Sequence, residues 1–258
     1  MMHENSTSLF KKCMLIICLV CLSACASLPN GPSEKDPLES YNRAMFGFNE
    51  GLDKYLLKPV AEGYDTVLPG PVKTGVSNFF SNIGDLFVII NDLLQFKLTQ
   101  ALADTGRFFF NTTLGLYGLI DVATPIGLHK HHEDFGQTLA TWGVGSGPYF
   151  VLPFFGANTL RSSGGLFVES IYDPVYNVKD NNTRYATISL TTIDTRYKLL
   201  KTSRVVEQAA VDKYSFVRDA YIQHRNNLIY DGNPPEETNV PVPKTTDEDL
   251  DLEKELGL

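Results

Sequence analysis

Residues 72–94 read VKTGVSNFFSNIGDLFVIINDLL, and this stretch decides the fold class. Its apolar side chains recur at spacings of three and four residues, which places them on one face of a helix. From Leu86 to Ile90 the stretch is apolar on every side. Such a helix is either fully buried or in contact with something as apolar as a protein core. The stretch therefore predicts a long helix in one of these two surroundings.

Further helices are predicted on both sides of this stretch. Helical periodicity marks residues 38–52, 98–114 and 193–228. The first of these segments is closed by the Pro-Gly-Pro cluster at residues 69–71. The last forms one long helix, or two helices broken near residues 202–203. We therefore predict an all-α fold with a single large domain.

Two long segments are almost free of charge. Residues 108–129 contain one charged side chain, Asp121, and residues 135–168 contain one, Arg161. Glycines and prolines interrupt both, so neither provides the uninterrupted apolar helix of about 20 residues that crosses a bilayer. The two segments are either irregular chain inside a buried core or an apolar perimeter that lies in a membrane.

The N-terminus is typical of an exported lipoprotein. Lys11 and Lys12 precede an apolar run of about ten residues, which is the length of a signal sequence and too short for a membrane span. The run ends in Leu-Ser-Ala-Cys at residues 22–25, which predicts a signal peptide over residues 1–24 and a lipid anchor on Cys25. The alternative is an ordinary signal peptide with a cysteine at the cleavage site. Because Ala26 and not an aspartate follows Cys25, we expect the outer membrane.

The remaining chain divides into three parts. Residues 25–37 are a tether rich in turn formers, and residues 38–231 are the helical domain. Residues 232–258 are an acidic tail that cannot bury enough apolar surface to fold alone, or an arm that docks a partner. The net charge of −8 argues against nucleic acid as a ligand. Contact with a membrane should therefore be apolar.

Signals for catalysis or metal binding are weak. Residues 143–147 read Gly-Val-Gly-Ser-Gly, which places glycines directly beside Ser146 and so departs from the Gly-x-Ser-x-Gly nucleophile elbow. Residues 129–134 read His-Lys-His-His-Glu-Asp, a set rich in zinc ligands, but neighbouring loop residues rarely close a zinc site. We expect a structural turn and a solvated polar loop, with no catalytic residues, no metal and no cofactor.

Several short motifs together resemble the MlaA (VacJ) lipoprotein family. They lie in family order over residues 36–180. The longer ones are DPLE at 36–39, YNR at 41–43, GVSNFF at 75–80, NTTLG at 111–115, IDVA at 120–123, EDFGQTL at 133–139, WGVG at 142–145, GPY at 147–149 and TLR at 159–161. Ser162 and Ser163 stand where an aspartate often follows in that family, which leaves any ion pair of Arg161 open.

The resemblance implies a function as well as a fold. It implies a ring-like, all-helical lipid-transport domain at the membrane interface, held on the periplasmic side of the outer membrane. Such a protein removes misplaced phospholipids from the outer leaflet through a polar channel. It passes them to a periplasmic lipid carrier, beside a trimeric outer-membrane porin. No covalent chemistry is required, so the resemblance implies a transporter component and not an enzyme.

The same resemblance assigns roles to particular residues. Phe48 and Asn49 lie in a segment whose packing should affect the channel. Aromatic residues of the apolar segments should contact lipid or the membrane. These are Phe79, Phe80, Phe87, Phe108, Phe109, Phe110, Trp142, Tyr149 and Phe150.

Two other functions stay open. A lipid-active hydrolase would use an unrecognised site around Ser146 or His131, and its products would be lyso-lipid and fatty acid. A structural lipoprotein that braces a porin would carry no phospholipid.

Overall fold

The computed structural model describes residues 36–235, and this part of the chain is mostly helical. Its α-helices are α2 (Glu39–Leu52), α3 (Lys58–Val67), α4 (Gly70–Leu94), α5 (Leu98–Thr113), α6 (Phe135–Thr141), α7 (Leu160–Tyr172), α8 (Asn181–Lys198), α9 (Leu200–Ala209) and α10 (Lys213–Ile229). A π-helical turn, η1 (Asp53–Leu57), joins α2 to α3, and a 3-10 turn, η2 (Thr124–Ile126), lies between α5 and α6. The predicted helical fold class is confirmed. The predicted signal peptide, Cys25 and most of the acidic tail lie outside the described residues.

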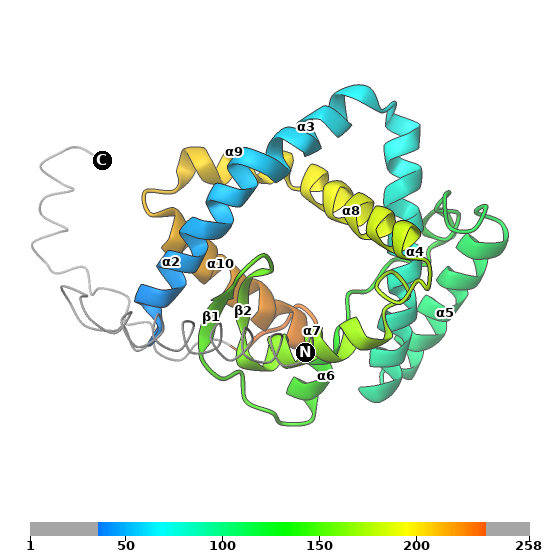
Figure 1. Cartoon of the computed structure of the whole chain (residues 1–258). Coiled ribbons are helices and arrows are strands. Elements are labelled where there is room, and N and C mark those ends of the chain that lie inside the picture. The colour runs from blue at the N-terminus through cyan, green and yellow to red at the C-terminus, as the bar shows by residue number, and fades with distance from the viewer. Residues whose placement is uncertain (1–35, 236–258) are drawn as a thin grey trace, which may run out of the picture.

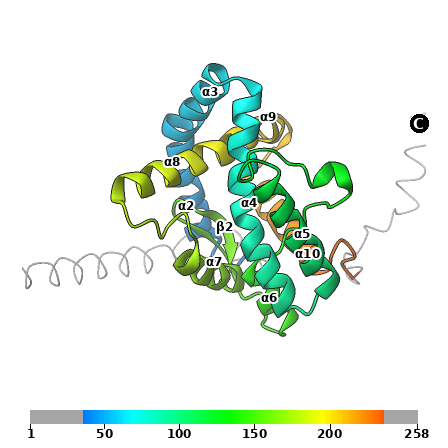
Figure 2. The ribbon, with the colours of Figure 1, turned by 90° about the vertical axis from the view of Figure 1, so that its right-hand side faces the viewer.

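The helices are arranged in a circuit (Figure 1). The continuous run α2–η1–α3 leads to α4, which descends on the other side of the molecule, with α5 packed along its outer face (Figure 2). The circuit closes through α6, α7 and α10, and α10 contacts both α6 and the strand β2. Helix α8 crosses from α9 toward α4 and packs on α3. This arrangement agrees with a ring-like domain, whose place at a membrane remains a prediction.

A small hairpin interrupts the helical chain. Strands β1 (Tyr149–Leu152) and β2 (Gly156–Thr159) pair antiparallel, with Tyr149 opposite Thr159 and Leu152 opposite Gly156. Phe154 in the connection has a φ of +69°, a backbone conformation that costs a non-glycine residue about 1 kcal/mol or more. The hairpin was not predicted from the sequence.

The two central helices begin and end close to where the sequence placed them. The predicted segments 72–94 and 98–114 correspond to α4 and α5. The prediction for the C-terminal third was wrong, because residues 202–203 lie inside α9. The breaks come instead at Leu199 and at Ala210–Asp212, where the side chain of Asp212 caps α10 by accepting a hydrogen bond from the amide of Tyr214.

The interior of the described chain is more polar than apolar. Apart from glycines, its buried residues comprise nine apolar and sixteen polar or charged ones. One buried apolar cluster is formed by Tyr149, Val151 and Tyr214, with Met45 and Phe46 packed against it. None of the helices between residues 36 and 235 is long and apolar enough to cross a membrane. Buried polar side chains and exposed large apolar ones are the informative departures from an ordinary globular core.

Candidate functional site: a polar interior behind an apolar surface

Helices α4 and α5 face each other with polar side chains. The buried polar residues recur at spacings of three or four on α5 and of three, four or seven on α4, so they form one stripe along each helix. On α4 and its C-cap they are Asn82, Asp85, Asn91, Asp92 and Gln95, and on α5 they are Asp104, Arg107 and Asn111. Ordinary amphipathic helices bury the opposite face. The pair therefore encloses a polar layer.

The outward sides of the same helices are apolar. Ile90 and Leu93 on α4 are each 51% exposed, and Leu102 and Phe109 on α5 are 74% and 59% exposed. Phe96, in the short connection between the helices, is 83% exposed. Full burial of residues 86–90, one of the two predicted surroundings, is wrong because Ile90 faces outward. Large apolar side chains exposed in such numbers are typical of a surface that contacts a membrane or another protein.

The loop after α5 extends this apolar surface. Its large side chains are exposed, namely Leu114, Leu116, Tyr117, Leu119, Ile120 and Ile126. Leu116 and Tyr117 both have positive φ, at 52° and 59°, so the loop holds two apolar side chains in a conformation that is costly for them. The expectation of irregular chain in a buried core is wrong for residues 114–126. Contact of this surface with a membrane remains a prediction.

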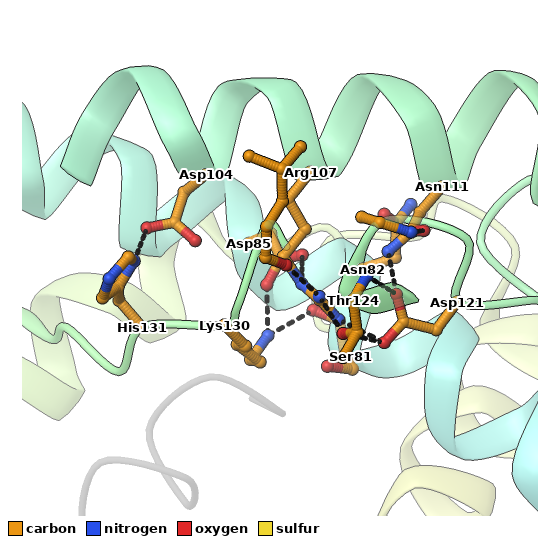
Figure 3. Close-up of polar contacts among 12 residues, drawn as sticks. Ser81, Asn82, Asp85, Asp104, Arg107, Asn111, Asp121, Thr124, Lys130 and His131 are labelled. Carbon is orange, nitrogen blue, oxygen red and sulfur yellow. Dashed lines mark hydrogen bonds and ion pairs between the residues drawn. The ribbon is translucent and has the colours of Figure 1, made fainter. Parts of the chain in front are cut away.

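Arg107 is the centre of the charged part of the interior (Figure 3). Its Nη2 donates to Asp121 at 2.9 Å, and its Nη1 donates to Thr124 Oγ1 at 2.7 Å. Its Nε lies 3.4 Å from a carboxylate oxygen of Asp85. Lys130 also pairs with Asp85 and donates to the carbonyl of Ser81 at 2.9 Å. Two cations and two carboxylates thus join α4, α5 and the loop that follows α5.

Asparagine side chains complete the polar layer. Asn111 donates to Asp121 at 3.1 Å and accepts the backbone amides of Val122 and Ala123 at 2.8 and 3.0 Å. Asn82 donates to Thr112 Oγ1 at 2.9 Å. The loop approaches Asn82 so closely that a Cβ on Gly118, where φ is +88°, would lie 2.7 Å from its side chain. The apolar loop is thus attached to the interior by polar contacts.

A second group of acids lies farther along the same layer. Asp104 is fully buried and contacts His131 Nδ1 at 2.7 Å. Asp92 is also fully buried, and neither of its carboxylate oxygens has a hydrogen-bond donor in the described chain. Burial raises the pKa of Asp92 to about 7, and the charges of Asp104 and Glu133 add to the effect. This carboxyl group therefore titrates near neutral pH.

Burial acts on the other acids too, with different results. It raises the pKa of Asp85, although Lys130 and Arg107 oppose the shift. For Asp121, hydrogen bonds from Thr124 and Arg107 outweigh the effect of burial and lower the pKa. Asp121 therefore stays ionised as the partner of Arg107, whereas burial favours the protonated form of Asp92.

Helix α6 joins the layer from its other end. Gln95 donates to Glu133 at 2.7 Å and to Thr138 Oγ1 at 3.2 Å, and Lys97 donates to Glu133 at 2.8 Å. Thr138 in turn donates to Asn91 at 2.8 Å. These bonds extend the polar layer from α4 across to α6.

The comparisons with known proteins identify the family. The family model for the MlaA lipoprotein matches residues 34–228. The chain belongs to the MlaA lipoprotein family. It is 37% identical over 240 residues to the intermembrane phospholipid transport system lipoprotein MlaA of Escherichia coli, covering 90% of this chain and 94% of that protein. The relative of the same name from Haemophilus influenzae is 30% identical over 84% of this chain and 89% of its own length.

A solved structure supports the same assignment. It comes from work on how bacterial outer-membrane lipid asymmetry is maintained, and it shares 36% sequence identity with this chain. The match covers 77% of this chain and 99% of that structure, with a TM-score of 0.66. The resemblance inferred from short motifs is therefore confirmed.

Within this MlaA-family fold, Phe48 and Asn49 both contact the hairpin. Asn49 donates to the carbonyl of Leu152 at 2.9 Å and accepts the amide of Phe154 at 2.8 Å. The rings of Phe48 and Phe154 pack edge to face at 5.5 Å. Two helical turns earlier on α2, Asn42 binds the backbone of β1 in the same way, through Tyr149 and Val151. Helix α2 therefore holds the hairpin at both ends.

The aromatic residues predicted to contact lipid have different surroundings. Phe109 and Trp142 are exposed. Six are half-buried, namely Phe79, Phe80, Phe87, Phe108, Phe110 and Phe150. The prediction was wrong for Tyr149, which is 3% exposed and packs against Tyr221 at 6.0 Å. The alternation of β1 turns Tyr149 and Val151 into the core.

The His-rich loop at residues 129–134 is tied into the interior and is not merely solvated. Lys130, His131 and Glu133 have the partners described above, and Asp134 caps α6 and pairs with Arg225. No group of three or more potential metal ligands occurs within residues 36–235. Ser146 lies in a pocket of about 110 Å³ whose lining residues include no histidine and no acid.

Sequence reasoning missed the polar layer. Its signal was present in α4, where the polar residues at 82, 85, 92 and 95 follow the same spacing as the apolar ones. A polar stripe on a helix that is otherwise apolar indicates that the helix buries its polar side.

Proposed function

We propose that this chain is an outer-membrane lipoprotein, anchored through Cys25 on the periplasmic side, that transports phospholipid between membranes. It removes misplaced phospholipid from the outer leaflet, passes it to a periplasmic lipid carrier and so maintains the lipid asymmetry of the outer membrane. Membership of the MlaA family supports this proposal. The observation that carries it is the combination, on α4 and α5, of a buried polar layer with an exposed apolar surface.

The two surfaces match the two parts of a phospholipid. A polar head group that enters hydrocarbon without hydrogen bonds pays several kcal/mol or more. A polar passage next to α4 and α5 lowers this cost, while the acyl chains stay against apolar side chains. Irregular chain at membrane depth is tolerated where it is buried in protein or lines a watery cavity. The loop at residues 114–126, with apolar side chains outside and polar bonds inside, meets this condition.

The apolar surface also supports seating in the membrane. The exposed side chains of Leu102, Phe109, Leu116 and Tyr117 project from neighbouring elements. In this seat the domain lies in the inner leaflet beside the lipidated N-terminus. Of the aromatic residues predicted from the sequence, Phe109 and Trp142 are the ones that contact lipid in this arrangement. The six half-buried aromatic side chains lie at the edge of the contact.

We further propose an outer-membrane porin trimer and a periplasmic lipid carrier as the partners. The porin supplies a rigid wall for the seated domain, and the carrier removes the transported lipid. Phe48 and Asn49 affect the passage through the hairpin, because both side chains contact it. Transport of this kind breaks no covalent bond, so the protein acts without catalytic residues.

A transfer assay tests the proposal. Full-length lipidated protein is reconstituted into vesicles that contain fluorescent phospholipid, and a periplasmic phospholipid-binding protein collects the lipid. We expect intact phospholipid to move faster than in vesicles without the protein. Mass spectrometry of the collected lipid separates the alternatives, since lyso-lipid would indicate a hydrolase. No acceleration and no bound lipid would indicate a structural brace.

A charge-balanced double variant tests the polar layer. Asp85→Asn with Lys130→Met removes an interior ion pair without changing the net charge. We expect transfer to fall several-fold while the circular dichroism spectrum is unchanged. The matched control is Lys58→Met with Glu207→Gln, which removes a surface pair of 3.2 Å. Equal transfer by the two double variants would contradict a role of the polar layer in transport.

A further inference from the structure

A small pocket lies away from the α4–α5 layer, between the glycine-rich loop, the hairpin and α10. Its volume is about 110 Å³, and a single buried water needs about 10–15 Å³ of such volume, so the pocket has room for several waters or one small ion. Its lining residues are Ser146, Gly147, Tyr149, Thr159, Arg161, Ser162, Ile222, Arg225 and Asn226. The lining holds two arginines and no acid, in a chain whose net charge is −8.

Arg161 has no carboxylate partner among residues 36–235. The one hydrogen bond of its side chain there is from Nη1 to the carbonyl of Val144, at 2.8 Å. Its Nε is buried and has no partner. A guanidinium carries five N–H donors in a planar fork that matches carboxylate and phosphate oxygens. Most of the donors of Arg161 are thus unused by the protein.

Arg225 adds a second guanidinium, which one carboxylate pairs through the two Nη atoms. It forms a two-pronged pair with Asp134, with Nη2 to Oδ1 at 3.0 Å, and its Nε is buried without a partner. Glu169, the next acid near Arg225, is engaged by the amide of Phe135 at 2.7 Å and by Asn91 at 3.3 Å. Burial and the charge of Arg225 lower the pKa of Arg161, so a bound anion would stabilise the charged form of Arg161.

We infer that this pocket binds a phosphate group, held by the guanidiniums of Arg161 and Arg225 with Ser146 and Asn226 at its rim. Neither the hydroxyl of Ser146 nor the side-chain amide of Asn226 makes a hydrogen bond within residues 36–235, so both are available to a ligand. The first amides of α7 are not the donors, since those of Leu160 and Arg161 are bonded to Pro148 and Ser146 carbonyls. The site is therefore built from side chains.

The pocket also couples a bound phosphate to the glycine-rich loop. Arg161 holds the loop through the carbonyl of Val144 and, through its own amide, the carbonyl of Ser146 at 3.1 Å. Gly147 has a φ of +67°, and a Cβ there would lie 2.7 Å from Leu160. The loop therefore packs directly on the first turn of α7, and a ligand on Arg161 is placed against it.

Two sources could supply the phosphate group, a free phosphate ion or the head group of a phospholipid. Binding of a phospholipid head group rests on the proposed function, whereas binding of a free phosphate ion does not. Equilibrium dialysis of full-length protein in detergent with radiolabelled inorganic phosphate tests the first source. Titration with dihexanoyl phosphatidylethanolamine tests the second, with dihexanoylglycerol as the control that lacks phosphate. Trp142, the single tryptophan, lies beside the loop and reports lipid binding by fluorescence.

The decisive variant is Arg161→Gln. We expect it to weaken binding of the active probe on the order of tenfold or more, because it removes a charge-assisted pair of donors. The matched control is Arg204→Gln, an exposed arginine on α9 with the same loss of charge. Ser146→Asp is a second variant on the exposed loop, and its carboxylate should occupy the arginines and displace the ligand while folding is retained.

The outcomes separate the possibilities. Binding of phosphate that is lost in Arg161→Gln and Ser146→Asp supports a site for the free ion. Binding of phosphatidylethanolamine alone, lost in the same variants, supports a head-group site. Binding of neither probe, or an equal effect of Arg161→Gln and Arg204→Gln, would overturn the inference. A transfer assay that fails while phosphate binding persists would count against the transport proposal and leave this site intact.

Discussion

Replacing Asp92 with asparagine should stabilise the protein more at pH 8 than at pH 5. Asp92 is fully buried between α4 and α5, with no hydrogen-bond donor in the described chain, and its folded pKa is about 7 instead of the ordinary 3.8. Below pH 3.8 the carboxyl is protonated in both the folded and the unfolded state, so its raised folded pKa does not lower the free energy of unfolding there. Stability is lost as the pH rises through the folded pKa.

The size of the effect follows from the two pKa values. The difference between an unfolded pKa of 3.8 and a folded pKa of about 7 lowers the free energy of unfolding by roughly 4 kcal/mol once the group is ionised in both states. Asp92, Asp104 and Glu133 interact, so a proton lost at one position is partly compensated at the others. We therefore expect the advantage of the asparagine to grow by about 2 kcal/mol between pH 5 and pH 8.

Thermal unfolding of detergent-solubilised protein, followed by circular dichroism at several pH values, measures this difference. For a chain of this size about 2 kcal/mol corresponds to a change of roughly 4–8 °C in Tm. Asp219→Asn on α10 is the control, since the Asp219 side chain is 51% exposed and has little burial cost to lose. A Tm difference for Asp92→Asn that stays constant from pH 5 to pH 8 would refute the reasoning.

Three further predictions concern packing and the interior. Arg107→Leu leaves Asp85 and Asp121 without their shared partner and should cost about 3–5 kcal/mol in chemical denaturation; a loss below about 1 kcal/mol would contradict this. Asn49→Ala removes the acceptor of the Phe154 amide, so hydrogen exchange at this amide should accelerate. An unchanged exchange rate would show that the Asn49–Phe154 hydrogen bond does not stabilise the hairpin turn. Gly165→Ala places a Cβ 2.5 Å from the amide of Gly136 and should destabilise by about 1–3 kcal/mol, whereas Gly164→Ala, with open space, should be neutral or stabilising.

The long helices could be predicted because their apolar residues keep a helical period. Helix α4 begins at Gly70 and ends at Leu94, within two residues of the predicted segment. The helix period does not show which side faces inward. Both burial in a core and contact with an apolar surrounding were therefore left open, and the structure places Ile90 and Leu93 outside and Asp92 inside. The solvent around a helix, water or lipid, decides its orientation, and the period is the same in both.

Shorter elements escaped prediction because their signals are local. Helix α6 has seven residues, and its N-terminus is marked by Asp134, whose side chain accepts the amide of Gln137 at 2.9 Å. This pair of an aspartate and a glutamine three residues later is a capping signal that we read as part of a polar loop. Thr159 caps α7 in the same way, through the amide of Ser162. The hairpin depends on Asn42 and Asn49, which lie over 100 residues away in sequence.

The polar interior and the apolar exterior place different demands on stability. In water, each Å² of apolar surface that stays exposed leaves out about 25 cal/mol of folding free energy that burial would supply. Buried ion pairs add little net stability, because their attraction is offset by the cost of desolvating the charges. Neither feature stabilises a helical domain in water. In a membrane the exposed side chains of Leu102, Phe109 and Tyr117 are solvated by lipid, and the hydrogen bonds of Arg107 and Asn111 hold the loop against α5. Under the transport proposal, the same residues that make the fold costly in water therefore allow an irregular chain to line a polar passage inside a bilayer.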